Sequence, residues 1–121
     1  MLANLKNGQL SKKPYIFQKK NIICSKILNI LWDDGYILGY KIYSNKPYFF
    51  IIFLKYYKNN PCITRIHGFS KPSRRFYMSV KEIWKIENEV GLLILSTNKG
   101  VLPLKTCKRF NVGGELLVYL K

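Results

Sequence analysis

Two short polar segments near the C-terminal end hold the side chains best suited to binding an anion. The first is Ser96-Thr97-Asn98-Lys99-Gly100 and the second is Asn111-Val112-Gly113-Gly114-Glu115. Hydroxyl, amide and ammonium groups bind phosphates, ribose hydroxyls and base edges, and glycine lets a backbone approach a ligand closely. The sequence between them adds three cations, Lys105, Lys108 and Arg109. The combination predicts contact with a phosphate backbone.

Each segment taken alone also fits a plainer interpretation, and in isolation the plainer one is favoured. The first fits an ordinary polar turn, and the second fits a helix end followed by a turn. The first segment lacks the G-x-x-x-x-G-K-[ST] spacing of a nucleotide-binding loop. We expect it to follow a strand and precede a helix, where backbone N–H groups can face an anion.

The charge balance of the chain indicates an anionic partner. The chain has 121 residues, with 21 Lys and Arg against 6 Asp and Glu, and a formal net charge of +15. Such an excess opposes compaction unless an anionic partner neutralises it. Nucleic acid is the leading partner and an anionic membrane surface is the second. The cations are scattered along the chain, which favours a folded basic surface over a disordered arm.

A basic stretch, Ser70-Lys71-Pro72-Ser73-Arg74-Arg75, is the best candidate for a linker. Its proline and serines favour a connection between two lobes. Its cations can also clamp a phosphate backbone, and the two interpretations do not exclude each other.

Groups for catalysis and metal binding are few. His67 is the only histidine, and the three cysteines, Cys24, Cys62 and Cys107, include no C-x-x-C pair. No spacing typical of a catalytic triad or a zinc site is present, so we predict neither an enzyme, nor a metal site, nor a cofactor. The most apolar run, 48–54, is about a third of the length that a membrane-spanning helix needs.

Periodicity predicts an α+β arrangement in the first half of the chain. Apolar residues recur on one helical face over 21–34, and a shorter helix is expected to end near Gly8. An antiparallel hairpin is expected from 36–43 and 48–57, and 62–69 can supply a third strand. The helix would then cover one face of the sheet. The aromatic residues over 48–57 can stack nucleobases, but they lack an RRM signature, and core packing is favoured.

The second half is expected to alternate short strands and short helices. The Ser79 to Glu82 spacing matches a capping box, after a strand-like 76–78. A buried strand is expected at 91–95 and a basic helix at 103–110, with Pro103 in its first turn. The chain would end in a strand over 115–120.

Four patterns in series, in the right order, resemble one known family. Gly91 to Val101 reads G-L-L-I-L-S-T-N-K-G-V, and 109–117 reads R-F-N-V-G-G-E-L-L. Upstream lie Ser70-Lys71-Pro72 with Arg75 and Tyr77, and a helix that ends in G-Y-I at 35–37. Together they resemble the eighth small-subunit ribosomal protein family across nearly the whole chain. The chain departs from the family pattern at Asn98, where serine is usual, and at Pro103, where an acidic helix start is usual.

The resemblance implies two small lobes. These are an N-terminal helix-on-antiparallel-sheet lobe (1–69) and a β-rich C-terminal lobe with a short helix (76–121), joined by the basic linker 70–75. It implies a structural protein that binds the central domain of small-subunit rRNA and touches neighbouring small-subunit proteins, without forming a homo-oligomer. The residues expected to bind RNA are Lys6, Lys71, Pro72, Arg74, Arg75, Ser96, Thr97, Asn98, Lys99, Gly100, Lys105, Lys108, Arg109, Gly113, Gly114 and Glu115.

Amino acids with A/T-rich codons are abundant, and no import signal is visible. We therefore expect a mitochondrial ribosome, with a plastid or the bacterial cytoplasm as the alternative. The alternative functions are a basic peripheral membrane protein and a generic nucleic-acid-binding protein. A membrane role would need a basic amphipathic helix or a lipid anchor, and neither is seen.

Overall fold

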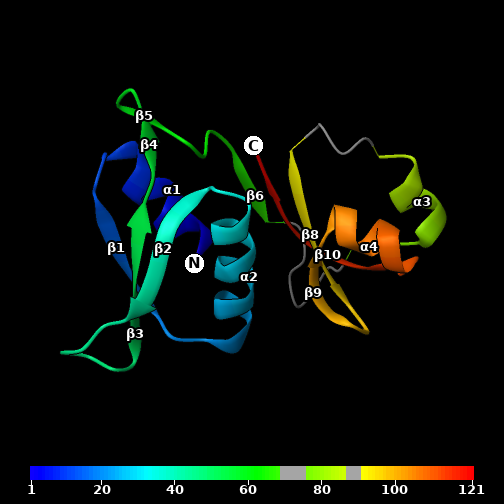
Figure 1. Cartoon of the computed structure of the whole chain (residues 1–121), viewed down its shortest axis with the longest axis horizontal. Helices are drawn as coiled ribbons and strands as arrows, with labels where there is room; N and C mark the ends of the chain where they lie inside the picture. The colour runs from blue at the N-terminus through cyan, green and yellow to red at the C-terminus, as the bar shows by residue number, and fades with distance from the viewer. Residues whose placement is uncertain (69–75, 87–90) are drawn as a thin grey trace. The chain divides into compact units, whose positions relative to one another are not determined.

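The computed structural model describes residues 1–68, 76–86 and 91–121. Contacts within the chain define two compact units, Met1–Thr64 and Arg65–Lys121. Both units combine helices with antiparallel strands (Figure 1), which confirms the predicted α+β class.

The N-terminal unit is built on a three-stranded antiparallel sheet. Its elements are α1 (Leu2–Leu10), β1 (Tyr15–Lys19), α2 (Ile22–Asp33), β2 (Ile37–Ile42), β3 (Phe49–Leu54), β4 (Tyr56–Tyr57) and β5 (Asn60–Pro61). The strand order is β1-β3-β2, and β4 and β5 form a separate two-stranded ribbon. Helix α1 contacts β1 and α2 contacts β2.

Helix α2 is capped at its start and ends at a glycine. The Asn21 side chain accepts a hydrogen bond from the Ile23 N–H at 2.9 Å, which satisfies one of the free donors at the helix start. Gly35 follows the last turn at φ +78°, a left-handed conformation that glycine adopts without a Cβ clash. The predicted helix over 21–34 is therefore confirmed.

Strand β3 contributes to both faces of this sheet. Phe50, Ile52 and Leu54 are buried and, like Ile16 of β1, belong to the core with α1 and α2. Because side chains alternate along a strand, Phe49, Ile51 and Phe53 point to the opposite face. Of the six aromatic residues at 48–57 only Phe50 is buried, and on the opposite face of β3 only Ile51 is, so core packing explains only part of this run.

Two predictions about this unit are wrong. Helix α1 continues to Leu10, and Gly8 does not end it. Gly8 lies inside the helix against Ile16, where a Cβ would leave too little room, so the glycine serves close packing. The third strand of the sheet is β1, not the segment 62–69. Strand β6 (Ile66–Gly68) pairs instead with β10 (Gly114–Leu120) in the C-terminal unit. That pairing joins residues far apart in sequence, which local patterns do not reveal.

The C-terminal unit carries two short helices and a larger sheet. Its remaining elements are β7 (Tyr77–Met78), α3 (Val80–Trp84), β8 (Leu92–Thr97), β9 (Gly100–Pro103) and α4 (Leu104–Phe110). The strand order is β6-β10-β8-β9, and β7 also pairs with β10. Ser79 caps α3 as predicted, because its hydroxyl accepts from the Glu82 N–H at 3.3 Å.

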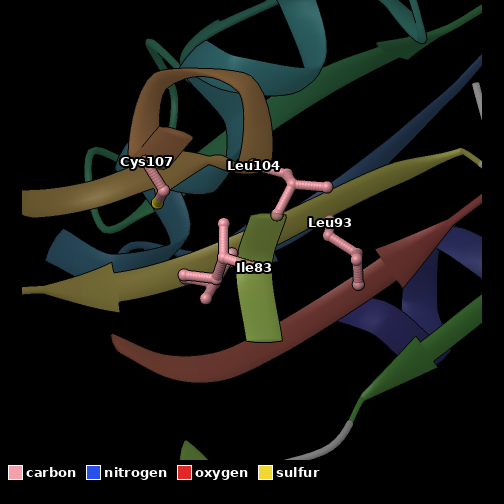
Figure 2. Close-up of a cluster of buried hydrophobic side chains, with 5 residues drawn as sticks. Ile83, Leu93, Leu104 and Cys107 are labelled. Carbon is pink, nitrogen blue, oxygen red and sulfur yellow. The ribbon is translucent and has the colours of Figure 1, made fainter. Parts of the chain in front are cut away.

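The core of this unit lies between α3, α4 and one face of the sheet. Figure 2 shows Ile83 of α3 and Leu104 and Cys107 of α4 gathered near Leu93 of β8. Leu95 completes this buried cluster, and Leu102 and Leu116 pack beside it. Burial raises the pKa of the Cys107 thiol, since the thiolate would lose its hydration. This cysteine is therefore a packing residue and a poor nucleophile.

Candidate nucleic-acid interface

The first polar segment forms a β-hairpin. Thr97 pairs with Gly100 and Ser96 with Val101, so Asn98 and Lys99 form the turn between β8 and β9. Gly100 has φ +111°, which a residue with a side chain adopts only with strain. The expected helix does follow, as α4, but strand β9 lies between it and this segment. Any anion here would meet a hairpin tip and no helix N-terminus.

The Thr97 hydroxyl holds the turn together. It accepts a hydrogen bond from the Lys99 backbone N–H at 3.1 Å and donates one to the Gly100 carbonyl at 2.8 Å. Thr97 is half-buried, whereas the side chains of Asn98 and Lys99 are exposed. The turn therefore presents an amide and an ammonium group outward, and Thr97 sets their position.

Strand pairing brings the two polar segments together. Ser96 of β8 lies directly opposite Glu115 of β10, and Glu115 also pairs with Tyr77 of β7. Paired residues place their side chains on the same face of a sheet. The neighbouring pair, Leu95 and Leu116, faces the helices α3 and α4. Ser96 and Glu115 therefore point to the other face, where both are half-buried.

The two glycines before Glu115 let three strands meet. A Cβ on Gly113 would lie 2.5 Å from the Met78 carbonyl oxygen. A Cβ on Gly114 would overlap the Ser96 carbonyl oxygen and lie 2.9 Å from Cγ2 of Thr97. Neither contact can be relieved by rotating a side chain alone, because both involve backbone oxygens. The glycines thus allow close approach, but to the chain's own backbone.

An aromatic ring that was not among the predicted site residues lies against two exposed cations. Nζ of Lys99 lies 5.1 Å from the Phe110 ring centroid, and Cζ of Arg109 lies 5.2 Å from it. Phe110 is exposed at the end of α4, and Lys105 is exposed on the same helix. The signal that could have found Phe110 is an aromatic residue directly after two cations. It stabilises both positive charges through its ring face.

Lys108 is engaged inside the unit. Its Nζ donates a hydrogen bond to the Ile86 carbonyl oxygen and lies 5.8 Å from the Trp84 ring centroid. Nε1 of Trp84 in turn donates to Oδ1 of Asn111 at 3.1 Å. These contacts join the end of α4 to α3. These contacts limit the access of a ligand to Lys108.

Asn111 has two structural roles that a substitution can separate. Its φ of +53° ends α4 in a left-handed conformation, and its side chain holds Trp84. We expect Asn111→Ala to lose about 1–2 kcal/mol of unfolding free energy, because it strains the backbone and removes the hydrogen bond. Asn111→Gly should lose less, since it relieves the φ. Urea unfolding followed by tryptophan fluorescence measures both, and equal stability of all three proteins would contradict this assignment.

The remaining predicted residues lie elsewhere. Lys71, Pro72, Arg74 and Arg75 are outside the described residues. Lys6 is exposed on α1 and belongs to the N-terminal unit. Among the described residues, no group of three or more His, Cys, Asp or Glu could hold a metal ion. No helix in the described part of the chain is long and apolar enough to cross a membrane.

Comparison with known proteins identifies the family. The model of the family described as Ribosomal protein S8 matches residues 1–120. The chain belongs to the ribosomal protein S8 family. The "Small ribosomal subunit protein uS8" of Borrelia hermsii is 41% identical over 119 residues, covering 97% of this chain and 90% of that protein. The protein of the same name from Wigglesworthia glossinidia brevipalpis is 35% identical over 121 residues, covering 100% of this chain and 93% of that protein.

A third relative, from Caulobacter sp., carries the same name and is 39% identical over 119 residues, 97% of this chain and 90% of its own. Membership of the S8 family extends over both compact units, because residues 1–120 span them. It confirms the resemblance that the four sequence patterns indicated.

Proposed function

We propose that this protein is a structural component of the small ribosomal subunit and that its C-terminal unit binds the central domain of small-subunit rRNA. The S8 family is a structural, non-enzymatic part of the ribosome that binds rRNA and other small-subunit proteins. The observation that carries the assignment of the site is the pairing of Ser96 with Glu115. It places both predicted segments at one end of one sheet, next to the Lys99 hairpin tip.

The chemistry of these groups suits a distorted RNA helix. The Ser96 hydroxyl can donate to or accept from a ribose or base edge, and the Glu115 carboxylate can accept from a 2′-hydroxyl or a base amino group. Asn98 can both donate and accept at the turn. Regular A-form RNA hides its base edges from side chains in a deep, narrow major groove. An irregular helix with an accessible minor groove is therefore the expected target.

The cations serve the phosphate backbone. Lys99, Lys105 and Arg109 carry exposed charges on the hairpin tip and α4. Phosphate contacts set the position of a protein on RNA, while base and 2′-hydroxyl contacts set which RNA it binds. In this proposal the helix α4 positions the unit, and Ser96, Asn98 and Glu115 select the site. Thr97, Gly100, Gly113 and Gly114 support them by shaping the backbone.

We place the protein in the small subunit of a mitochondrial ribosome, as a single copy beside other small-subunit proteins. The mitochondrial location is supported by a composition rich in lysine, isoleucine and asparagine, which is typical of A/T-rich coding. Co-sedimentation with small subunits from purified mitochondria tests this location, and recovery only with plastid or bacterial subunits would overturn it. A peripheral membrane role has less support, because a lipid surface would not require the Ser96–Glu115 arrangement.

A double substitution tests the binding site. We expect Ser96→Ala with Lys99→Ala to weaken binding to the cognate rRNA helix by about 2 kcal/mol, roughly thirtyfold in Kd, because it removes a hydroxyl contact and a phosphate contact. The matched control is Ser11→Ala with Lys13→Ala, which changes the same residue types at exposed positions after α1. Filter binding at one fixed salt concentration compares the two. Equal losses would mean that only total charge matters and would refute the site.

A further inference from the structure

The sheet of the N-terminal unit has a second face that the rRNA site does not use. On this face Tyr15 lies opposite Phe53, and Phe17 lies opposite Ile51, which also pairs with Lys41 of β2. We call the group Tyr15, Phe17, Tyr43, Phe53 and Lys41 the aromatic face. It is opposite the buried Phe50, Ile52 and Leu54, which face the core. These rings therefore do not belong to the hydrophobic core of the unit.

The rings on the aromatic face contact one another and remain accessible. The Phe17 centroid is 5.5 Å from Tyr15, in an edge-on arrangement, and 4.9 Å from Tyr43. Tyr15 is 44% exposed and Phe17 is 42% exposed. Nζ of Lys41 lies 5.8 Å from the Phe53 centroid. The packing orders the side chains, so little conformational entropy would be lost if a flat ligand stacked on them.

Two hollows open on this face. One of about 250 Å³ is lined by Phe17, Tyr43, Lys46 and Phe49. A broader one of about 580 Å³ is lined by Tyr15, Lys41, Ile42, Tyr43, Ser44, Ile51 and Phe53. Tyr43 borders both hollows, and a lysine borders each. Each hollow therefore combines aromatic surface with a cation, the pair of features that accepts a base and its phosphate.

The positive charge of the sheet selects against a purely apolar partner. Residues 15–20 and 37–57 contain five lysines, Lys19, Lys20, Lys41, Lys46 and Lys55, and no aspartate or glutamate. A purely apolar partner would leave Lys41 and Lys46 beside a surface that cannot pair with them. A polyanion with flat, stackable groups complements both the charge and the rings.

We propose that the aromatic face binds a single-stranded RNA segment, whose unpaired bases stack on Phe17, Tyr43 and neighbouring rings while Lys41 and Lys46 contact its phosphates. Stacking requires no particular base, because every base has a π-face. The interaction is thus sequence-tolerant and differs in kind from the 2′-hydroxyl and base-edge contacts proposed for Ser96 and Glu115. It is confined to the N-terminal unit and does not depend on the rRNA site.

Matched double variants of the full chain test the proposal. Tyr43→Leu with Lys41→Ala removes one ring and one charge from the aromatic face. Tyr57→Leu with Lys58→Ala removes the same types from the β4–β5 ribbon, where Nζ of Lys58 lies 5.4 Å from the Tyr57 centroid. The probe is a labelled single-stranded oligouridine, measured by fluorescence anisotropy at fixed salt. We expect the first variant to bind about tenfold more weakly and the second to bind like the parent.

Photocrosslinking from 4-thiouridine in the same oligonucleotide identifies the residues that contact the RNA. Crosslinks at 15–19 or 41–53 support the proposal, and crosslinks confined to 65–121 overturn it. Equal losses in the two variants also overturn it, because they would mean a generic charge effect. Protein-to-protein crosslinks that join this face to a neighbouring protein in the assembled subunit would overturn the proposal as well. A variant that loses the oligonucleotide but keeps the cognate rRNA helix separates this face from the Ser96 site.

The double variant Lys41→Ala with Lys46→Ala is a control for misfolding of the sheet. It leaves every ring in place and should still weaken oligouridine binding. If far-UV circular dichroism is unchanged and affinity is also unchanged, the phosphate part of the proposal is refuted.

Discussion

Gly114→Ala is expected to unfold the C-terminal unit or to leave it severely destabilised. A methyl group there would overlap the Ser96 carbonyl oxygen, and Cγ2 of Thr97 would be 2.9 Å away. The clash is with the backbone of β8, so β10 would have to move away from its longest partner strand. We expect a loss of about 3 kcal/mol or more, at the upper end for overpacking. Urea unfolding followed by circular dichroism measures it.

Gly100→Ala is the control for this substitution. Its φ of +111° also disfavours a side chain, but a Cβ there would have no heavy atom within 4 Å. The expected cost is backbone strain alone, about 1–2 kcal/mol. The order of stabilities should be parent, then Gly100→Ala, then Gly114→Ala. A Gly114→Ala protein with the parent's unfolding midpoint would mean that β8 and β10 do not approach this closely.

Affinity for the cognate rRNA is expected to fall roughly a hundredfold between 50 and 200 mM monovalent salt. Lysine and arginine release condensed counterions when they neutralise phosphates, and about four such contacts give a slope near −3.6 in a plot of log Kobs against log salt. Exposed cations on the hairpin tip and α4, namely Lys99, Lys105 and Arg109, supply most of them. Titrations at four or more salt concentrations give the slope. A flat dependence would exclude a backbone-dominated interface.

Single substitutions assign this slope to residues. Lys99→Ala should reduce its magnitude by about one, because one phosphate contact is lost. Lys13→Ala, on the exposed segment after α1, should leave the slope unchanged. Lys108→Ala should change stability more than the slope, since Lys108 already donates to the Ile86 carbonyl. If Lys13 and Lys99 proved equivalent, binding would reflect the net charge of the whole chain.

The local elements were predictable where short-range chemistry decides them. The Asn21 cap, the left-handed Gly35 and the Ser79–Glu82 capping box involve residues at most a few positions apart. The hairpin of β2 and β3 follows from two apolar runs around a turn. The prediction for the strand over 62–69 places it in the wrong sheet. This strand pairs with the last strand of the chain, about fifty residues away, and the alternation of apolar residues does not indicate which strand is the partner.

The candidate site divides in the same way. Residue types alone pointed to Ser96, Asn98, Lys99 and Glu115 as groups able to bind RNA. They did not reveal that Thr97 hydrogen-bonds within its own turn, that Lys108 is held by Ile86 or that Phe110 lies under two cations. These facts depend on which backbone atoms and rings come within reach after folding.

By itself, the sequence determined the α+β class, the strong positive charge, the family and the two polar segments. These depend on composition, periodicity and ordered motifs, which are properties of the linear chain. Only the tertiary structure decided that Ser96 and Glu115 are neighbours, through the antiparallel register of β8 and β10. It also decided that Gly113 and Gly114 serve strand packing, because the excluded volume that requires glycine comes from residues 78 and 96.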